Sequence, residues 1–186
     1  GMNTTRDFIY TNQDDGFTAQ MPFSPKYAVI NYKDPVLLGT TANEVEVTQT
    51  GLLDLKRALL KIDVVNHSDT SLLRVEHHWA GPKGKNPMGY KLSTSRYWRI
   101  TGNLSTGFDA TATINYNGLP QSGRLDIDLL SHSEDSILLL FRKDARDPWL
   151  EYPFYQKNIL NNPNNGIGRM ELSKVLEGEY VFANGI

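Results

Sequence analysis

Cysteine is absent from this 186-residue chain, which excludes disulfides, zinc–thiolate sites and thiol catalysis. An excess of charge of one sign is absent too, because 19 basic side chains stand against 21 acidic ones. No long-range positive field would gather nucleic acid or anionic lipid. Apolar runs of the ~20 residues that span a bilayer are also missing. We therefore expect neither nucleic-acid binding nor membrane insertion.

The first residues bear on where the protein works. Gly1 before Met2 resembles a scar left by removal of a purification tag, and no basic, apolar signal segment follows it. If Met2 is the native initiator, a cytoplasmic protein is expected. If Met2 is an internal residue, a signal peptide belongs upstream and the protein is exported to the cell envelope or secreted. The sequence leaves both alternatives open.

Apolar and polar residues alternate with a period of two along most of the chain, which predicts strands with one buried face. Residues 137–141 are instead continuously apolar, which is typical of a central strand covered on both sides. The predicted strands are 27–32, 44–48, 58–64, 72–79, 96–101, 108–116, 124–129, 137–141, 149–155, 167–172 and 179–183. Two weaker patterns, at 52–59 and 172–176, suggest short helices.

Many short strands separated by Asn-, Gly-, Asp- and Pro-rich turns predict an all-β fold built from sandwiches. A polar turn near residue 102 suggests a boundary. Our first expectation is two packed immunoglobulin-like β-sandwich modules, 23–101 and 102–186, each near the lower size limit of that fold. One larger sandwich is the second alternative. Residues 1–22 are poorly patterned, as expected for a linker or an edge extension.

The predicted strand 72–79 carries the most reactive side chains. Alternation places His77 on one face, and Arg74, Glu76 and His78 on the other. Glu76 and His78 could supply a carboxylate and an imidazole to a metal ion, which are donors found together in many metal sites. The alternative is a hydrogen-bonded core histidine at 77 beside a surface cluster of charges.

Other catalytic patterns are missing from the sequence. A third metal ligand would have to come from His67 or His132, and their spacing does not indicate it. There is no Gly-x-Ser-x-Gly elbow, no His-Glu-x-x-His pair and no phosphate-binding Gly-x-x-x-x-Gly-Lys loop. We therefore expect a non-catalytic protein without a cofactor.

Aromatic side chains gather near the ends of predicted strands and offer a binding hypothesis. Trp79, Tyr97, Trp98 and Trp149 could stack on sugar rings or anchor a protein partner if they are exposed. Burial in the core of a sandwich is the structural alternative for each of them. A carbohydrate-binding module and a protein-binding module are thus the two classes of function that remain open.

Two stretches, VEHHWAGP at 75–82 and LSTSRYWRI at 92–100, occur in a distinctive order. With them, the chain resembles the β-rich region that follows the peptidase domain in exported aminopeptidase-N-like metallopeptidases of Bacteroidetes. Further matching stretches lie at 21–27, 48–51, 140–142, 149 and 178–183. The zinc-binding helix of those peptidases has no counterpart here, so none of their catalytic residues is carried over.

The resemblance implies an accessory module that contacts a partner or a neighbouring domain of the same polypeptide. The resemblance assigns no role to individual positions. A structural role is the alternative for three of them, with Arg96 bonded to loop carbonyls and Tyr97 and Trp98 packed between sheets. The ending, with Gly178 and Tyr180, is similar to the last strands of C-terminal sorting domains used for export by the same bacteria. A tyrosine that bonds back to a preceding turn explains that ending equally well.

Overall fold

The computed structural model describes residues 22–24, 39–84, 87, 89–130, 134–160 and 164–185. The chain divides into two compact units, and the second, which starts at Lys33, contains all the strands described below. The strand expected at 27–32, most of the expected linker 1–22 and His132 lie outside the described residues. Among the described residues, no helix is long and apolar enough to cross a lipid bilayer.

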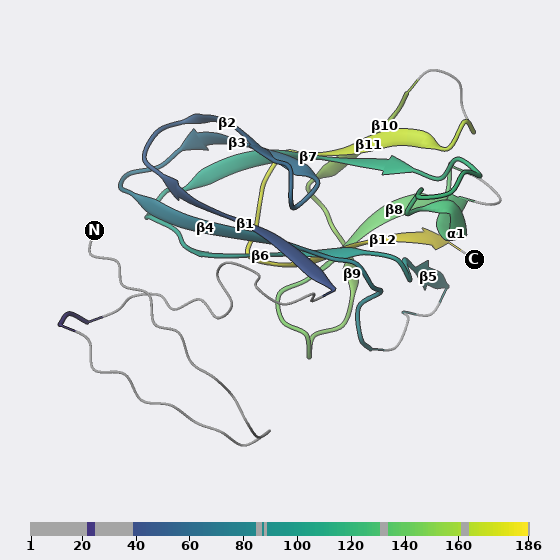
Figure 1. Ribbon diagram of the computed structural model, residues 1–186, viewed down its shortest axis with the longest axis horizontal. Coiled ribbons are helices and arrows are strands. Elements are labelled where there is room, and N and C mark those ends of the chain that lie inside the picture. The colour runs from purple at the N-terminus through teal and green to yellow at the C-terminus, as the bar shows by residue number, and fades with distance from the viewer. Residues whose placement is uncertain are drawn as a thin grey trace. The chain divides into compact units, whose positions relative to one another are not determined.

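Two antiparallel sheets pack face to face, one above the other in Figure 1. The seven-stranded sheet has the order β1-β4-β6-β12-β8-β9, with β5 paired to β12. Its strands are β1 (Thr40–Val47), β4 (Ser71–His78), β5 (Tyr90–Leu92), β6 (Tyr97–Asn103), β8 (Ile137–Arg142), β9 (Leu150–Glu151) and β12 (Gly178–Gly185). The expectation of an all-β sandwich is confirmed.

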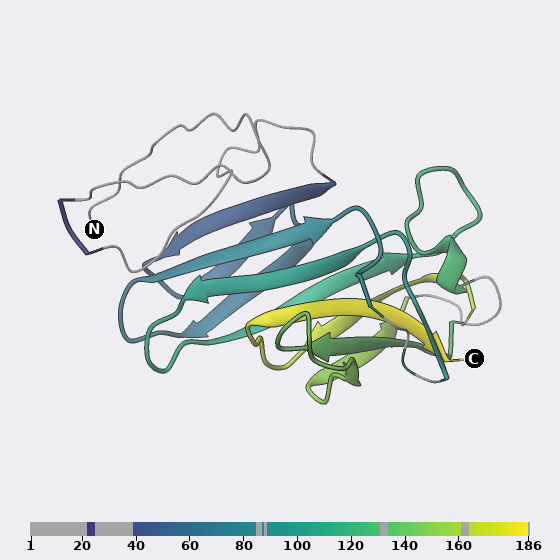
Figure 2. The same ribbon diagram turned by 90° about the horizontal axis from the view of Figure 1, so that it is seen from below.

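The five-stranded sheet has the order β10-β11-β7-β3-β2. Its strands are β2 (Gly51–Leu55), β3 (Leu60–Asn66), β7 (Asp109–Asn117), β10 (Tyr155–Ile159) and β11 (Ile167–Leu172). Figure 2 shows β12, in yellow, as a strand of the seven-stranded sheet that lies beside β8. Both sheets thus combine strands from the two halves of the sequence.

The expected division into two consecutive modules is therefore corrected. The boundary proposed between residues 101 and 102 falls inside β6, whose neighbours are β4 from the first half and β12 from the second. Since strands of one half complete the sheets of the other, the described residues of the second unit form a single sandwich, the second of the two alternatives. The immunoglobulin-like topology of the original expectation stays a prediction.

One apolar core fills the space between the sheets. The alternation in the sequence gives its members correctly: Ile62 and Val64 of β3, Leu73 and Val75 of β4, and Ala110, Ile114 and Tyr116 of β7 are all buried. Each fully buried large side chain stabilises the fold by roughly 1.5–3 kcal/mol. This packing explains why a chain without disulfides folds into a sandwich.

Four local expectations are wrong. The predicted strand 149–155 is two strands, β9 and the start of β10, which are separated by a turn and belong to different sheets. The predicted strand 124–129 is instead a turn followed by the short helix α1 (Ile127–Leu130), where the amides of Leu129 and Leu130 bond to the carbonyl of Asp126. The predicted helix 52–59 is β2 and a tight turn, because Leu52 to Leu55 pair with β3. The predicted helix 172–176 is the end of β11 and the connection to β12.

The last strand, β12, begins at a position that only glycine tolerates. Gly178 has φ of +149°, and a Cβ there would lie 2.5 Å from the carbonyl oxygen of Arg142. Two residues later, the Tyr180 hydroxyl donates to the carbonyl of Leu176 at 2.7 Å and accepts from its amide at 2.8 Å. The glycine and the tyrosine of this ending thus have a structural explanation.

Candidate functional site

The outer face of the seven-stranded sheet carries a row of alternating charges. In the strand register, Glu76 of β4 stands opposite Arg99 of β6, Arg99 opposite Glu179 of β12, and Glu179 opposite Arg142 of β8. Arg142 and Glu179 are nearly buried and form an ion pair at 2.6 Å. Cross-strand pairs of opposite charge stabilise a sheet, and here the row of pairs extends across four neighbouring strands.

Glu76 and His78, the candidate metal ligands, lie together in this face. His78 Nε2 is 3.3 Å from one Glu76 oxygen, while Arg74 Nε donates to the other at 2.9 Å. Arg74 also bonds to Glu44 at 3.2 Å. The hydrogen bond from His78, followed by the bond and charge of Arg74, lowers the Glu76 pKa to about 2 against the opposing effect of burial.

This geometry favours a charge cluster over a metal centre. Among the residues that the structure describes, no three His, Asp or Glu side chains are placed to share an ion. His67 lies in an exposed turn, where its Nδ1 is 3.2 Å from the carbonyl of Asp69. A guanidinium between Glu44 and Glu76 already supplies the positive charge that a metal ion would bring.

His77 points the other way, into the core, as the alternation predicts. The expected hydrogen bond is not formed, because neither ring nitrogen of His77 has a partner among the described residues. Its ring is fully buried, and the edges of Trp79 and Trp98 meet it at centroid distances of 4.4 and 5.5 Å. Burial, with smaller contributions from Arg96 and His78, lowers its pKa to about 3. His77 is therefore neutral at physiological pH and packs between two tryptophan rings in edge-to-face contacts.

Two of the four candidate aromatics are buried. Trp98 is inaccessible to solvent, and its indole nitrogen donates to the Ala58 carbonyl at 2.8 Å. Trp149 is 6% exposed and lies in a second, smaller apolar cluster on the outer face of the seven-stranded sheet, with the Arg142 guanidinium 4.3 Å from its ring centroid. Neither ring presents a free face to a ligand.

Tyr97 and Trp79 remain accessible, on different sides of the seven-stranded sheet. Tyr97 is half-buried on the outer face and stacks on His78, with ring centroids 4.1 Å apart. Trp79 follows β4 and is 45% exposed. The structure therefore does not assemble the four aromatics into one site, and Trp79 is the ring that a partner could reach most easily.

Trp79 is held rigidly although it is exposed. Its amide donates to the Gly39 carbonyl at 2.7 Å, its indole nitrogen donates to Thr41 Oγ1 at 3.1 Å, and its ring rests on buried His77. The Thr41 hydroxyl in turn donates to the Arg57 carbonyl at 2.6 Å, which links Trp79 to the turn between β2 and β3. We call Thr41, His77 and Trp79 the Trp79 site.

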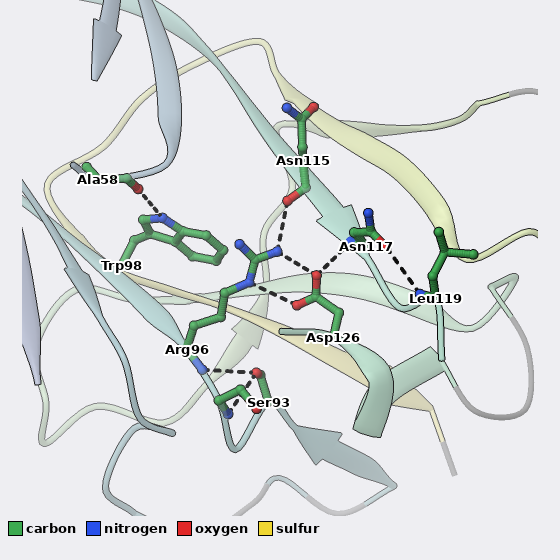
Figure 3. A network of polar contacts seen from close by, with 9 residues as sticks. Ala58, Ser93, Arg96, Trp98, Asn115, Asn117, Leu119 and Asp126 are labelled. Carbon is green, nitrogen blue, oxygen red and sulfur yellow. Dashed lines mark hydrogen bonds and ion pairs between the residues drawn. The ribbon is translucent and has the colours of Figure 1, made fainter. Parts of the chain in front are cut away.

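A buried ion pair next to this aromatic stack has a structural role (Figure 3). Arg96 bonds to both carboxylate oxygens of Asp126, at 2.9 and 2.6 Å, and to the Asn115 carbonyl at 2.8 Å. The Asn117 amide donates to the same carboxylate at 2.7 Å. Arg96 thus bonds to a main-chain carbonyl of strand β7 and not to the expected loop carbonyls. Trp98 packs between the sheets as expected, whereas Tyr97 does not.

A groove on the outer face of the five-stranded sheet was not foreseen from the sequence. It is a shallow, open groove of about 530 Å³ along β7, β10 and β11, and its outward side chains are Thr111, Thr113, Phe154, Gln156, Glu171 and Ser173. Phe154 is 41% exposed. The only signal for it in the sequence is the alternation that turns these side chains outward, because the residues come from three separate segments.

In comparisons with known proteins, no family model, no curated protein and no solved structure matches this chain.

Proposed function

We propose that the chain is a non-catalytic interaction module that contacts another protein, or a neighbouring domain of its own polypeptide, through the Trp79 site. The observation that carries this proposal is a tryptophan that is 45% exposed yet fixed by two hydrogen bonds and a ring contact. Such a ring loses little conformational entropy on binding, and tryptophans are prominent among the residues that dominate interface energies.

Two buried carboxylates are engaged in internal contacts, which supports a binding role. The Asp126 carboxylate is bonded to Arg96, and the Glu134 carboxylate accepts from the Tyr116 hydroxyl at 2.6 Å. Burial and Glu134 both raise the Tyr116 pKa, so its hydroxyl keeps its proton. These groups connect loops to strands and have the character of structural links.

The proposal includes the larger protein and the compartment to which the module belongs. Its place as an accessory region of a larger exported peptidase-like protein, in the cell envelope or secreted, is supported by the sequence resemblance alone. The alternative of an export-sorting ending gains less support, since Gly178 and Tyr180 are accounted for by packing. Sugar stacking on Trp149 is disfavoured because that ring is 6% exposed.

Site-specific photo-crosslinking tests this function. A photoreactive phenylalanine analogue would replace Trp79 in the polypeptide encoded by the complete native reading frame, expressed in its own host. We expect irradiation to link position 79 to one defined segment, either of the same polypeptide or of one co-purifying protein.

The matched control carries the same analogue at Leu52, which is 64% exposed but lies on the other sheet. A link that forms equally well from position 52, or no link from position 79, would contradict the proposal. A link within the polypeptide identifies a neighbouring domain as the partner, and a link between chains identifies a separate protein.

A further inference from the structure

The groove on the five-stranded sheet is built from two rows of outward side chains. In the first row, the register places Thr113 of β7 opposite Glu171 of β11, and Glu171 opposite Gln156 of β10. The second row, one step further along the strands, contains Thr111, Ser173 and Phe154. The groove therefore presents hydroxyl, carboxylate and amide groups beside one aromatic ring.

Phe154 is held in place by the residues behind it. Its ring meets that of Tyr152 edge to face, with centroids 5.7 Å apart, and Tyr152 is almost fully buried. The Tyr152 hydroxyl donates to the Lys174 carbonyl at 2.6 Å, and the Ser173 amide donates to the Phe154 carbonyl at 2.9 Å. The Lys174 ammonium also lies 5.8 Å from the centroid of this ring. The part of the ring that Lys174 and Tyr152 leave open is a preorganised platform for an apolar surface of a ligand.

The chemistry of the lining restricts the ligand. None of the residues that line the groove is a lysine or an arginine, and the one charged residue, Glu171, is paired with Arg169 at 2.6 Å. The neighbouring cations, Arg169 and Lys174, are engaged with Glu171 and with the Phe154 ring. An anionic ligand would therefore meet the Glu171 carboxylate without a free cation beside it among the described residues, and phosphates and acidic polymers are disfavoured. Short hydroxyl and amide side chains can both donate and accept hydrogen bonds, which suits a neutral ligand with many hydroxyl groups.

We propose that this groove binds a neutral saccharide. A sugar ring has one face of C–H groups and a rim of hydroxyls. The C–H face would lie on Phe154, while the hydroxyls would bond to Thr113, Gln156 and Glu171. The proposal is independent of the protein contact at Trp79, because the two sites lie on different sheets.

Affinity gel electrophoresis tests the saccharide site. The purified chain would migrate through native gels that contain starch, xylan, glucomannan, mixed-linkage β-glucan or, as an acidic polymer, polygalacturonate. We expect at least one neutral polymer to retard the chain. Phe154→Ala should weaken that binding about tenfold or more, because the stacking surface is lost.

Gln156→Ala serves as the second variant, since its exposed side chain can be shortened without disturbing the core. We expect it to weaken binding as well, while a thermal melt confirms that it folds. Leu52→Ala, on the same sheet, and Trp79→Ala should leave the retardation unchanged. The proposal is overturned if none of these neutral polymers retards the chain, if only polygalacturonate does, or if Phe154→Ala and Gln156→Ala bind like the unmodified chain.

Discussion

Arg96 and Asp126, thirty residues apart in the sequence, face each other in a two-point ion pair with N–O distances of 2.9 and 2.6 Å. Arg96 is 4% exposed and Asp126 is fully buried. The Arg96 guanidinium carbon also lies 4.8 Å from the Trp98 ring centroid and 5.1 Å from that of Phe182. The pair therefore ties the segment before α1 to β6 and to the aromatic core.

Removing one partner of this pair should destabilise the fold strongly. In Asp126→Asn, the guanidinium of Arg96 stays buried without a compensating negative charge, which typically costs about 3–5 kcal/mol. Urea unfolding followed by circular dichroism measures the loss. The control is Asp144→Asn, which breaks the exposed pair with Arg146 and should change stability little. Equal losses in the free energy of unfolding for the two variants would show that the buried pair stabilises the fold no more than the exposed pair.

His77 should make the protein less stable in mild acid. The folded-state pKa of about 3 lies below the usual value of 6.5, so the unfolded chain binds a proton that the folded chain does not. The contribution is complete above pH 6.5 and is lost as the pH falls toward 3. In that window the free energy of unfolding should fall by about 1 kcal/mol per pH unit.

His77→Phe isolates this effect, because phenylalanine can occupy the space between Trp79 and Trp98 but cannot titrate. We expect the variant to show a shallower loss of stability between pH 6 and pH 4 in urea unfolding at several pH values. His67→Phe, in an exposed turn, is the control. Parallel pH profiles for the unmodified chain and His77→Phe would refute the assignment.

Glu76 should add a second loss of stability at lower pH. Its folded-state pKa of about 2 lies below the usual 4.5, so its contribution is present above pH 4.5 and is lost as the pH falls toward 2. Glu76→Gln removes the charge that faces Arg74 and His78, and on the order of 1–2 kcal/mol should be lost at pH 7.

The difference in stability between the unmodified chain and Glu76→Gln should therefore shrink below pH 4.5, which denaturant unfolding at pH 7, 4 and 3 can follow. The matched control is Glu46→Gln on β1, where the carboxylate is exposed. A difference that stays constant with pH would show that the hydrogen bond to His78 does not hold Glu76 in its charged form.

The two faces of β4 show what the alternation of apolar and polar residues predicts correctly. Alternation assigns Val75 and His77 to the core and Arg74, Glu76 and His78 to the outer face, and the structure agrees. The same rule fails at 124–129, because the Asp126 carboxylate bonds to Arg96 and the Asn117 amide, and the chain turns there into α1. The local pattern of apolar and polar residues cannot predict a bond between two side chains that are thirty residues apart, such as Arg96 and Asp126.

The sequence by itself determined the all-β class, the inward and outward faces of most strands, and the absence of thiol chemistry, since these follow from side-chain periodicity and composition. Only the tertiary structure decided that both halves form one sandwich, that Trp98 and Trp149 are buried while Trp79 is not, and that Phe154 and Gln156 meet Thr113 in a groove. Strand order and loop placement bring distant residues together, and no local pattern encodes which strands become neighbours.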